Sequence, residues 1–226
     1  MSEAAGPAAA HRIPTYVRRS GRMGPTSQTA LVHDVPLRAL PTGWWNPAEV
    51  FPEFTRIALE IGSGMGEGAV QMAVADPTTA LIAAEVHDAG VAATARAADA
   101  AKCHNLWIYH GDGLDALTDH IPASTLAEIR IWFPDPWPKR KHHKRRLITA
   151  AHVSLMVDRL RLGGVLHTAT DVASYADVMQ HVLGGCAQLE PVLVGGPRPE
   201  WRPLTKFEAA GRTAGRQVVD FRYRKV

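Results

Sequence analysis

The stretch IALEIGSGMGEG at residues 57–68 decides the fold. The apolar run 57–61 predicts a buried strand, and the helical pattern over 67–75 predicts a helix directly after the glycines. Glycines at this turn allow the backbone to approach a ligand closely. The same spacing also fits the dinucleotide-binding fingerprint, so Gly62, Gly64 and Gly66 alone do not name a cofactor.

The rest of the chain continues the alternation of short apolar runs with helical patterns. Such alternation predicts an α/β, Rossmann-like fold with a mostly parallel seven-stranded sheet flanked by helices. The predicted strands cover residues 57–61, 80–86, 105–109, 127–133, 165–169, 189–194 and 217–223. The predicted helices cover residues 67–75, 89–102, 144–162 and 175–183.

Length and composition indicate one domain with an appendage. With 226 residues, 46% of them hydrophobic, the chain can bury one ordinary core. We expect residues 1–35 to form a flexible basic arm and residues 36–226 a single domain, with the proline-rich stretch 37–54 packed onto it. No apolar run reaches the ~18–20 residues needed to span a bilayer. Arg18-Arg19 precede no apolar export segment, and Cys103 and Cys186 form no redox or metal pattern, so we expect a cytoplasmic protein.

The net charge of +3 hides a strong segregation along the chain. Residues 11–33, 139–146 and 198–226 carry net charges of +4, +6 and +5, together +15, which leaves −12 on the remainder. An acidic body with basic pieces is typical of a protein that meets a polyanion. The run 139–146 is expected at the start of the helix 144–162, where cations oppose the helix dipole, and this placement favours a phosphate ligand. A solvated charged helix start is the alternative. His142 and His143 are adjacent and lack zinc-ligand spacing, so no metal is expected.

Three acids follow successive predicted strands. Glu60 stands just before the glycines, where a pyrophosphate would meet a like charge and a cationic cofactor would be attracted. This favours S-adenosylmethionine, a sulfonium with an ammonium group, over NAD. Glu85 is placed to accept ribose hydroxyls, and Asp112 lies in reach of the adenine amine. Strand ends converge in an open α/β sheet, although each acid alone could be a helix N-cap or a solvated loop residue.

The predicted strand 127–133 ends in the sequence FPDPWPK, residues 133–139. Three prolines stiffen this loop and hold Asp135 among aromatic side chains, which suits a flat, nitrogen-rich base. A proline turn with buried aromatics is the alternative. Trp137 can either stack on a flipped base or pack in the core.

The segment PDPWPKRKHHKRR, residues 134–146, strongly resembles the signature of the bacterial tRNA (guanine-N7-)-methyltransferases. The resemblance extends over most of the chain from about residue 16, and residues 1–10 and 184–200 depart from it. Matching segments are VRRSGRM at 17–23, the stretch 60–66, EVH at 85–87, TD at 170–171 with Tyr175, and TKFE at 205–208.

The resemblance implies an S-adenosylmethionine-dependent enzyme that methylates N7 of a guanosine in the tRNA variable loop, at tRNA position 46. It implies no obligatory protein partner and leaves monomer or homodimer open. It implies a catalytic role for Asp135 and cofactor binding by Glu60, Gly62, Gly64, Gly66, Glu85, Asp112 and Asp135. Substrate binding falls to Lys139, Asp171, Thr205, Lys206, Phe207 and Glu208. RNA contact falls to Lys141, His142, His143, Lys144, Arg145 and Arg146, and to Arg18, Arg19 and Arg22 of the arm.

Two other functions stay open at this point. One is a methyltransferase acting on another nucleic-acid base or on a small aromatic nitrogen compound, which would not need three basic segments. The other is a non-catalytic tRNA-binding module, against which the intact acids and glycines argue.

Overall fold

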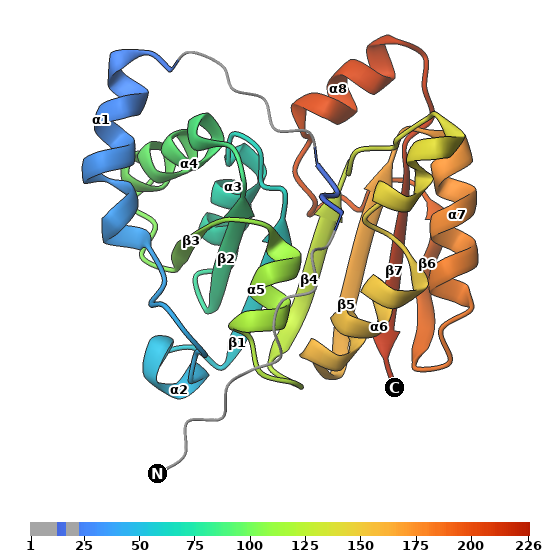
Figure 1. Ribbon diagram of the computed structural model, residues 1–226, viewed down its shortest axis with the longest axis horizontal. Coiled ribbons are helices and arrows are strands. Elements are labelled where there is room, and N and C mark those ends of the chain that lie inside the picture. Colours follow the sequence, from blue (N-terminus) through green and yellow to red (C-terminus); the bar gives the residue numbers. More distant parts are fainter. Residues whose placement is uncertain (1–12, 17–22) are drawn as a thin grey trace.

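The computed structural model describes residues 13–16 and 23–226, which contain a seven-stranded sheet in the order β3-β2-β1-β4-β5-β7-β6 (Figure 1). Strands β1 to β5 pair in parallel, and β7 is antiparallel to both β5 and β6. This confirms the mostly parallel seven-stranded sheet. The strands are β1 Arg56–Ile61, β2 Thr79–Glu85, β3 Leu106–His110, β4 Leu126–Trp132, β5 Leu160–Thr170, β6 Leu189–Gly196 and β7 Val219–Lys225.

Helices cover both faces of this sheet. They are α1 Pro25–His33, α2 Pro47–Val50, α3 Glu67–Ala75, α4 Asp88–Ala100, α5 Gly113–Asp119, α6 Ala150–Arg159, α7 Ala173–Gly184 and α8 Lys206–Thr213, with 3₁₀ helices η1 Val35–Arg38 and η2 Arg140–Arg145. Apolar residues of α3 and α4 pack in one core cluster, and those of α5, α6 and α7 pack in another. Every residue of β2 and β4 is buried, as expected for strands covered on two sides.

The order of the strands creates a crevice at one edge of the sheet. The chain moves outward from β1 through β2 to β3 and then returns to β4, which lies on the other side of β1. The loops after β1 and β4 therefore leave the sheet in different directions. In open parallel sheets this switch point, at the carboxyl ends of the strands, is where ligands bind.

The prediction of one helix over residues 144–162 is wrong. Residues 140–145 form η2, residues 146–149 are not helical, and α6 begins only after Thr149, whose side chain caps it by accepting the N–H of His152. Leu147 and Ile148 are buried, and the Ile148 N–H donates to the Tyr175 hydroxyl at 3.1 Å. Gly163, the residue after the end of the predicted helix, lies within β5 with a φ of 72°.

The prediction of a flexible arm over residues 1–35 is wrong for residues 25–35. Residues 25–33 form α1, which begins with a proline and packs against α4. Ala30 and Val35 are buried, with Val35 part of the core cluster that includes α3 and α4. Residues 1–12 and 17–22, which include Arg18, Arg19 and Arg22, lie outside the described residues. In the part of the chain that is described, no helix is long and apolar enough to cross a membrane.

Candidate active site at the strand ends

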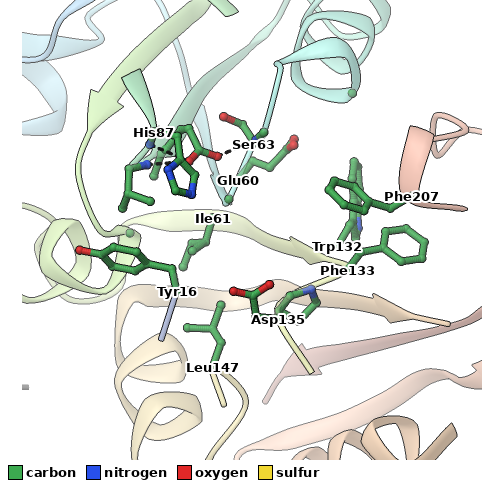
Figure 2. Close-up of a pocket in the computed structure, with 18 of the residues that line it drawn as sticks. Tyr16, Glu60, Ile61, Ser63, His87, Trp132, Phe133, Asp135, Leu147 and Phe207 are labelled. Atoms are coloured by element: carbon green, nitrogen blue, oxygen red, sulfur yellow. Dashed lines mark hydrogen bonds between the residues drawn. The ribbon is translucent and has the colours of Figure 1, made fainter. Parts of the chain in front are cut away.

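A pocket of about 320 Å³ opens at the switch point between β1 and β4 (Figure 2). Its wall comes from the loops after β1, β2, β3 and β4, from residues 15–16 near the N-terminus and from residues 205–207 before and within α8. The structure therefore brings together most of the residues expected to bind cofactor and substrate. Those that line the pocket are Glu60, Gly62, Gly64, Glu85, Asp112, Asp135, Thr205, Lys206 and Phe207.

The three glycines of the loop after β1 have two different roles. Gly62 and Gly64 have φ values of 79° and 58°, and a Cβ added to either would meet nothing within 4 Å. Their backbone therefore borders open space that a ligand can occupy. Gly66 does not line the pocket: its added Cβ would lie 2.3 Å from the Thr94 hydroxyl oxygen. Gly66 instead lets α3 pack closely against α4.

The carboxylate of Glu60 is buried at the base of the pocket. Its side chain projects from the end of β1, and its Oε2 atom has no hydrogen-bond partner within the described residues. Burial raises the pKa of Glu60 to about 7, although Arg130 lowers it. A buried acid without a partner is unfavourable unless a ligand supplies one. This site thus fits a cationic group, as the sequence predicted for S-adenosylmethionine.

Glu85 and Asp112 each combine a structural bond with a place in the pocket wall. The carboxylate of Glu85 accepts the backbone N–H groups of Gly64, Val86 and His87 at 2.8, 2.8 and 2.9 Å. It thereby fixes the glycine loop against the end of β2. Asp112 caps α5 by accepting the Leu114 N–H at 2.9 Å. The N-cap alternative is confirmed for Asp112, and it is compatible with ligand binding because carboxylate oxygens can accept more than one hydrogen bond.

The loop after β4 presents Asp135 and buries Trp137. Phe133 and Trp137 have φ values of 57° and 45°, so the stiff loop turns through strained backbone. Asp135 is exposed at the pocket wall. The aromatic pair Phe133 and Phe207 lies on one side of it, and Tyr16 lies on the other (Figure 2). Trp137 donates its indole N–H to the Thr15 carbonyl at 2.9 Å, and the Arg145 guanidinium lies 4.0 Å from its ring centroid. Trp137 is therefore a packing residue and not a platform for a base.

The basic run divides into outward and inward cations. Lys139, Lys141 and Lys144 are exposed, whereas Arg146 is buried. Arg146 donates to the Pro136 carbonyl at 2.9 Å and lies 4.8 Å from the Tyr175 ring centroid, so the structure turns this predicted RNA ligand inward. The run forms η2 and not the first turn of α6, so its cations do not oppose the dipole of that helix as expected.

The two acids expected to bind guanine are occupied by arginines and do not line the pocket. Glu208 is fully buried and pairs with Arg198, Arg202 and Arg212 at 3.2, 2.7 and 2.6 Å. Asp171 pairs with Arg216 at 2.7 Å. Both acids anchor α8 and the segment after it, so direct binding of a base by Glu208 is not supported. Lys139 is exposed outside the pocket wall.

Several pocket residues were not predicted. Tyr16, His87 and Leu147 line the pocket from three separate segments. His87 follows Glu85 in a motif that the sequence did display, and it could have been included on that ground. Tyr16 and Leu147 reach the pocket only through tertiary packing, for which the sequence carries no local signal.

The fold and the pocket define the Rossmann-like class of methyltransferases. The 16S rRNA methyltransferase KamB shares the fold with a TM-score of 0.61 at 13% identity, over 84% of this chain and 99% of that one. A Streptococcus mutans protein described as "a putative methyltransferase", solved with S-adenosylhomocysteine, gives a TM-score of 0.52 at 12% identity, over 77% of this chain and 90% of that one. A family model described as "Putative methyltransferase" matches residues 55–221.

Relatives at higher identity identify the family. The tRNA (guanine-N(7)-)-methyltransferase of Thiobacillus denitrificans is 42% identical over 95% of this chain and 96% of its own length. That of Alcanivorax borkumensis is 39% identical over 95% and 92%. The chain belongs to the tRNA (guanine-N(7)-)-methyltransferase family.

The inward position of Arg146 predicts a structural phenotype. Arg146→Met should lower the free energy of unfolding by ~1–3 kcal/mol, because the Pro136 carbonyl loses its charged donor and the Tyr175 ring loses its cation. Lys141→Met removes the same charge from an exposed position and should change stability by less than about 0.5 kcal/mol. Urea denaturation measures both, and equal stabilities would show that Arg146 does not hold the loop.

Proposed function

We propose that this protein transfers the methyl group of S-adenosylmethionine to N7 of a guanosine in the variable loop of tRNA, at tRNA position 46. One observation carries the proposal: the pocket is lined by the exposed Asp135 and by the buried Glu60, whose Oε2 atom has no hydrogen-bond partner within the described residues. The relatives that are about 40% identical over nearly the whole chain support the same reaction. The enzyme acts in the cytoplasm, as a monomer or homodimer, without an obligatory protein partner.

The residues that would hold the cofactor are those of the pocket wall. Glu60 offers an anion for its positive charge, and the backbone at Gly62 and Gly64 gives it close approach. Glu85 and Asp112 offer carboxylate oxygens for ribose hydroxyls and the adenine amine. When bound, S-adenosylmethionine supplies an electrophilic methyl group on a sulfonium.

Asp135 stabilises positive charge on the substrate and does not remove a proton from it. The guanine N7 lone pair lies in the ring plane and carries no proton, so no general base is needed before attack. Alignment of N7 with the methyl group is the main requirement. The guanine ring gains positive charge as the reaction proceeds, and the Asp135 carboxylate stabilises that charge. Phe207, exposed beside Phe133 with ring centroids 6.5 Å apart, offers an aromatic face to the base.

The exposed lysines of the basic run hold the RNA backbone. Lys139, Lys141 and Lys144 form no ion pair within the described residues, so their charges are available to phosphates. Most of the C-terminal cations are not available in this way, because Arg198, Arg202, Arg212, Arg216 and Arg224 pair with acids. The surface available to RNA phosphates therefore includes fewer cations than the three basic segments of the sequence contain.

The direct test is methyl transfer to unmodified tRNA transcripts, followed by nucleoside analysis. The proposal requires 7-methylguanosine that is lost when the guanosine of the variable loop is replaced by adenosine. A different methylated nucleoside, or none, would contradict it.

Replacement of Asp135 should separate turnover from binding. Asp135→Asn keeps the shape of the side chain and removes its charge, so kcat should fall by ~10²–10³-fold, the size seen when one electrostatic stabiliser is lost. The affinity for tRNA should change little, because Asp135 is not a phosphate ligand. Glu53→Gln, at an exposed acid outside the pocket, serves as the control. Single-turnover rates and filter binding measure the two quantities, and near-normal kcat in the Asn variant would refute the role.

The lysines of η2 and its flank should set the salt dependence of tRNA binding. Replacing Lys139, Lys141 and Lys144 together with alanine should flatten the slope of log affinity against log salt by about 2, since each lost phosphate contact accounts for ~0.7–0.9. Arg224→Ala is the control, because Arg224 already pairs with Glu190 at 3.0 Å and should leave the slope unchanged. An unchanged slope in the triple variant would place the RNA elsewhere.

A further inference from the structure

Glu60 belongs to a row of buried charged residues that crosses the sheet. Glu60 on β1 is paired in register with Arg130 on β4, and Arg130 is paired with His167 on β5. All three side chains are buried. The site that receives the cofactor's positive charge is therefore continuous with ionisable groups inside the protein.

Arg130 is already committed to a second acid. Its Nη2 atom donates to Glu128 Oε2 at 2.7 Å, and both side chains are nearly buried, with 6% and 10% exposed. Glu60 Oε2, Glu128 Oε1 and Arg130 Nε have no hydrogen-bond partner within the described residues. Arg130 thus pairs with Glu128 and acts on Glu60 only through its charge, so the three side chains carry a net charge of −1 when both acids are ionised. A buried net charge is costly unless a partner balances it.

The surroundings of Glu60 favour the protonated, uncharged form of its carboxyl group. Burial raises its pKa to about 7, Arg130 lowers that pKa, and Glu128 raises it. From the other elements packed against Glu60, β2 contributes the uncharged Ala83 and α3 the uncharged Gly68. The other ionisable residues that line the same pocket are Tyr16, Glu67, Glu85, His87, Asp112, Asp135 and Lys206.

We propose that Glu128 and Arg130 make the charge of Glu60 depend on the cofactor, so that binding of S-adenosylmethionine expels a proton from Glu60. In the free protein below about pH 7, the Glu60 carboxyl group is mostly protonated, and the buried group is neutral overall when it is. When the cofactor's cation enters, the Glu60 O–H bond breaks, the proton passes to solvent, and the carboxylate pairs with the cation. Glu128 and Arg130 are positioning residues in this step. The inference rests on the proposed function for the identity of the cofactor.

The number of protons released can be measured without tRNA. Isothermal titration calorimetry of the full chain with S-adenosylmethionine, repeated in buffers of different ionisation enthalpy, gives the count directly. At pH 6.5 an acid with a pKa near 7 is about three-quarters protonated, and the cofactor's amino group, with an ordinary pKa of about 7.7–8.0, is already charged. We therefore expect release of roughly 0.5–0.8 proton at pH 6.5. The release from Glu60 decreases as pH rises through 7, because the carboxyl is then already ionised in the free protein.

Three variants and one ligand identify the source. Glu60→Gln should abolish the release at pH 6.5. Glu128→Gln keeps an oxygen for Arg130 but removes the like charge, so it should lower the pKa of Glu60 and reduce the release at that pH. Glu53→Gln, at an exposed acid outside the pocket, should leave the release unchanged. Methylthioadenosine, which shares the adenosine and lacks both cations, should bind without proton release.

The outcomes separate this inference from the proposed function. Binding of S-adenosylmethionine with no proton release at pH 6.5, equal release in the Glu60→Gln variant, or equal release with methylthioadenosine would each overturn the inference and leave the proposed function standing. Absence of S-adenosylmethionine binding would overturn both. The wild-type and Glu60→Gln measurements decide the matter even if the Glu128 variant fails to fold.

Discussion

The return of the chain from β3 to β4, beside β1, is the constraint on which the site depends. It leaves the ends of β1 and β4 side by side while their loops diverge, and the pocket fills the space between them. The end of β1 supplies Glu60, the loop after β1 supplies the glycines, and the loop after β4 supplies Asp135. The cofactor side and the substrate side of the reaction therefore come from neighbouring strands. Neither loop could form the pocket alone, because each provides only one wall.

Buried ion pairs fix the position of α8, which together with the residue before it forms a third wall of the pocket. Arg202 is fully buried and binds both oxygens of Asp220 on β7, through Nε at 2.7 Å and Nη2 at 3.0 Å. It also pairs with Glu208 on α8 at 2.7 Å. Buried charges are tolerated when they are paired in this way, and the pairing fixes the position of α8 relative to β7. Thr205 and Phe207 reach the pocket because α8 is held there. Arg202, a cation of the basic C-terminal segment, thus serves the architecture of the pocket.

The strand order and the acids at the strand ends could be predicted because their signals are local. Apolar runs, glycines and the acid that follows each strand are adjacent in sequence, and the rule that strand ends converge places Glu60, Glu85 and Asp112 together. The roles of Glu208 and Arg146 could not be predicted, because a sequence gives the charge of a side chain but not the direction in which it points. The helix expected over 144–162 failed for a related reason. Burial of Leu147 and Ile148 and the cap at Thr149 interrupt a pattern whose periodicity alone favours a continuous helix.

In the basic run at residues 139–146, side-chain chemistry influences whether a cation points into the protein or toward solvent. Its three lysines are exposed, whereas Arg145 and Arg146 place their guanidinium groups over the rings of Trp137 and Tyr175. A guanidinium is planar, weakly hydrated and rich in directed donors, so it can stack on a ring and bind carbonyl oxygens at the same time. An ammonium is compact and strongly hydrated, and it loses more by leaving water. Within one run of like charge, Arg145 and Arg146 can therefore stabilise the protein while the three lysines and the exposed Arg140 remain available to phosphates. The number of cations in such a run sets an upper limit on its phosphate contacts, and the burial of each cation decides whether it can make such a contact.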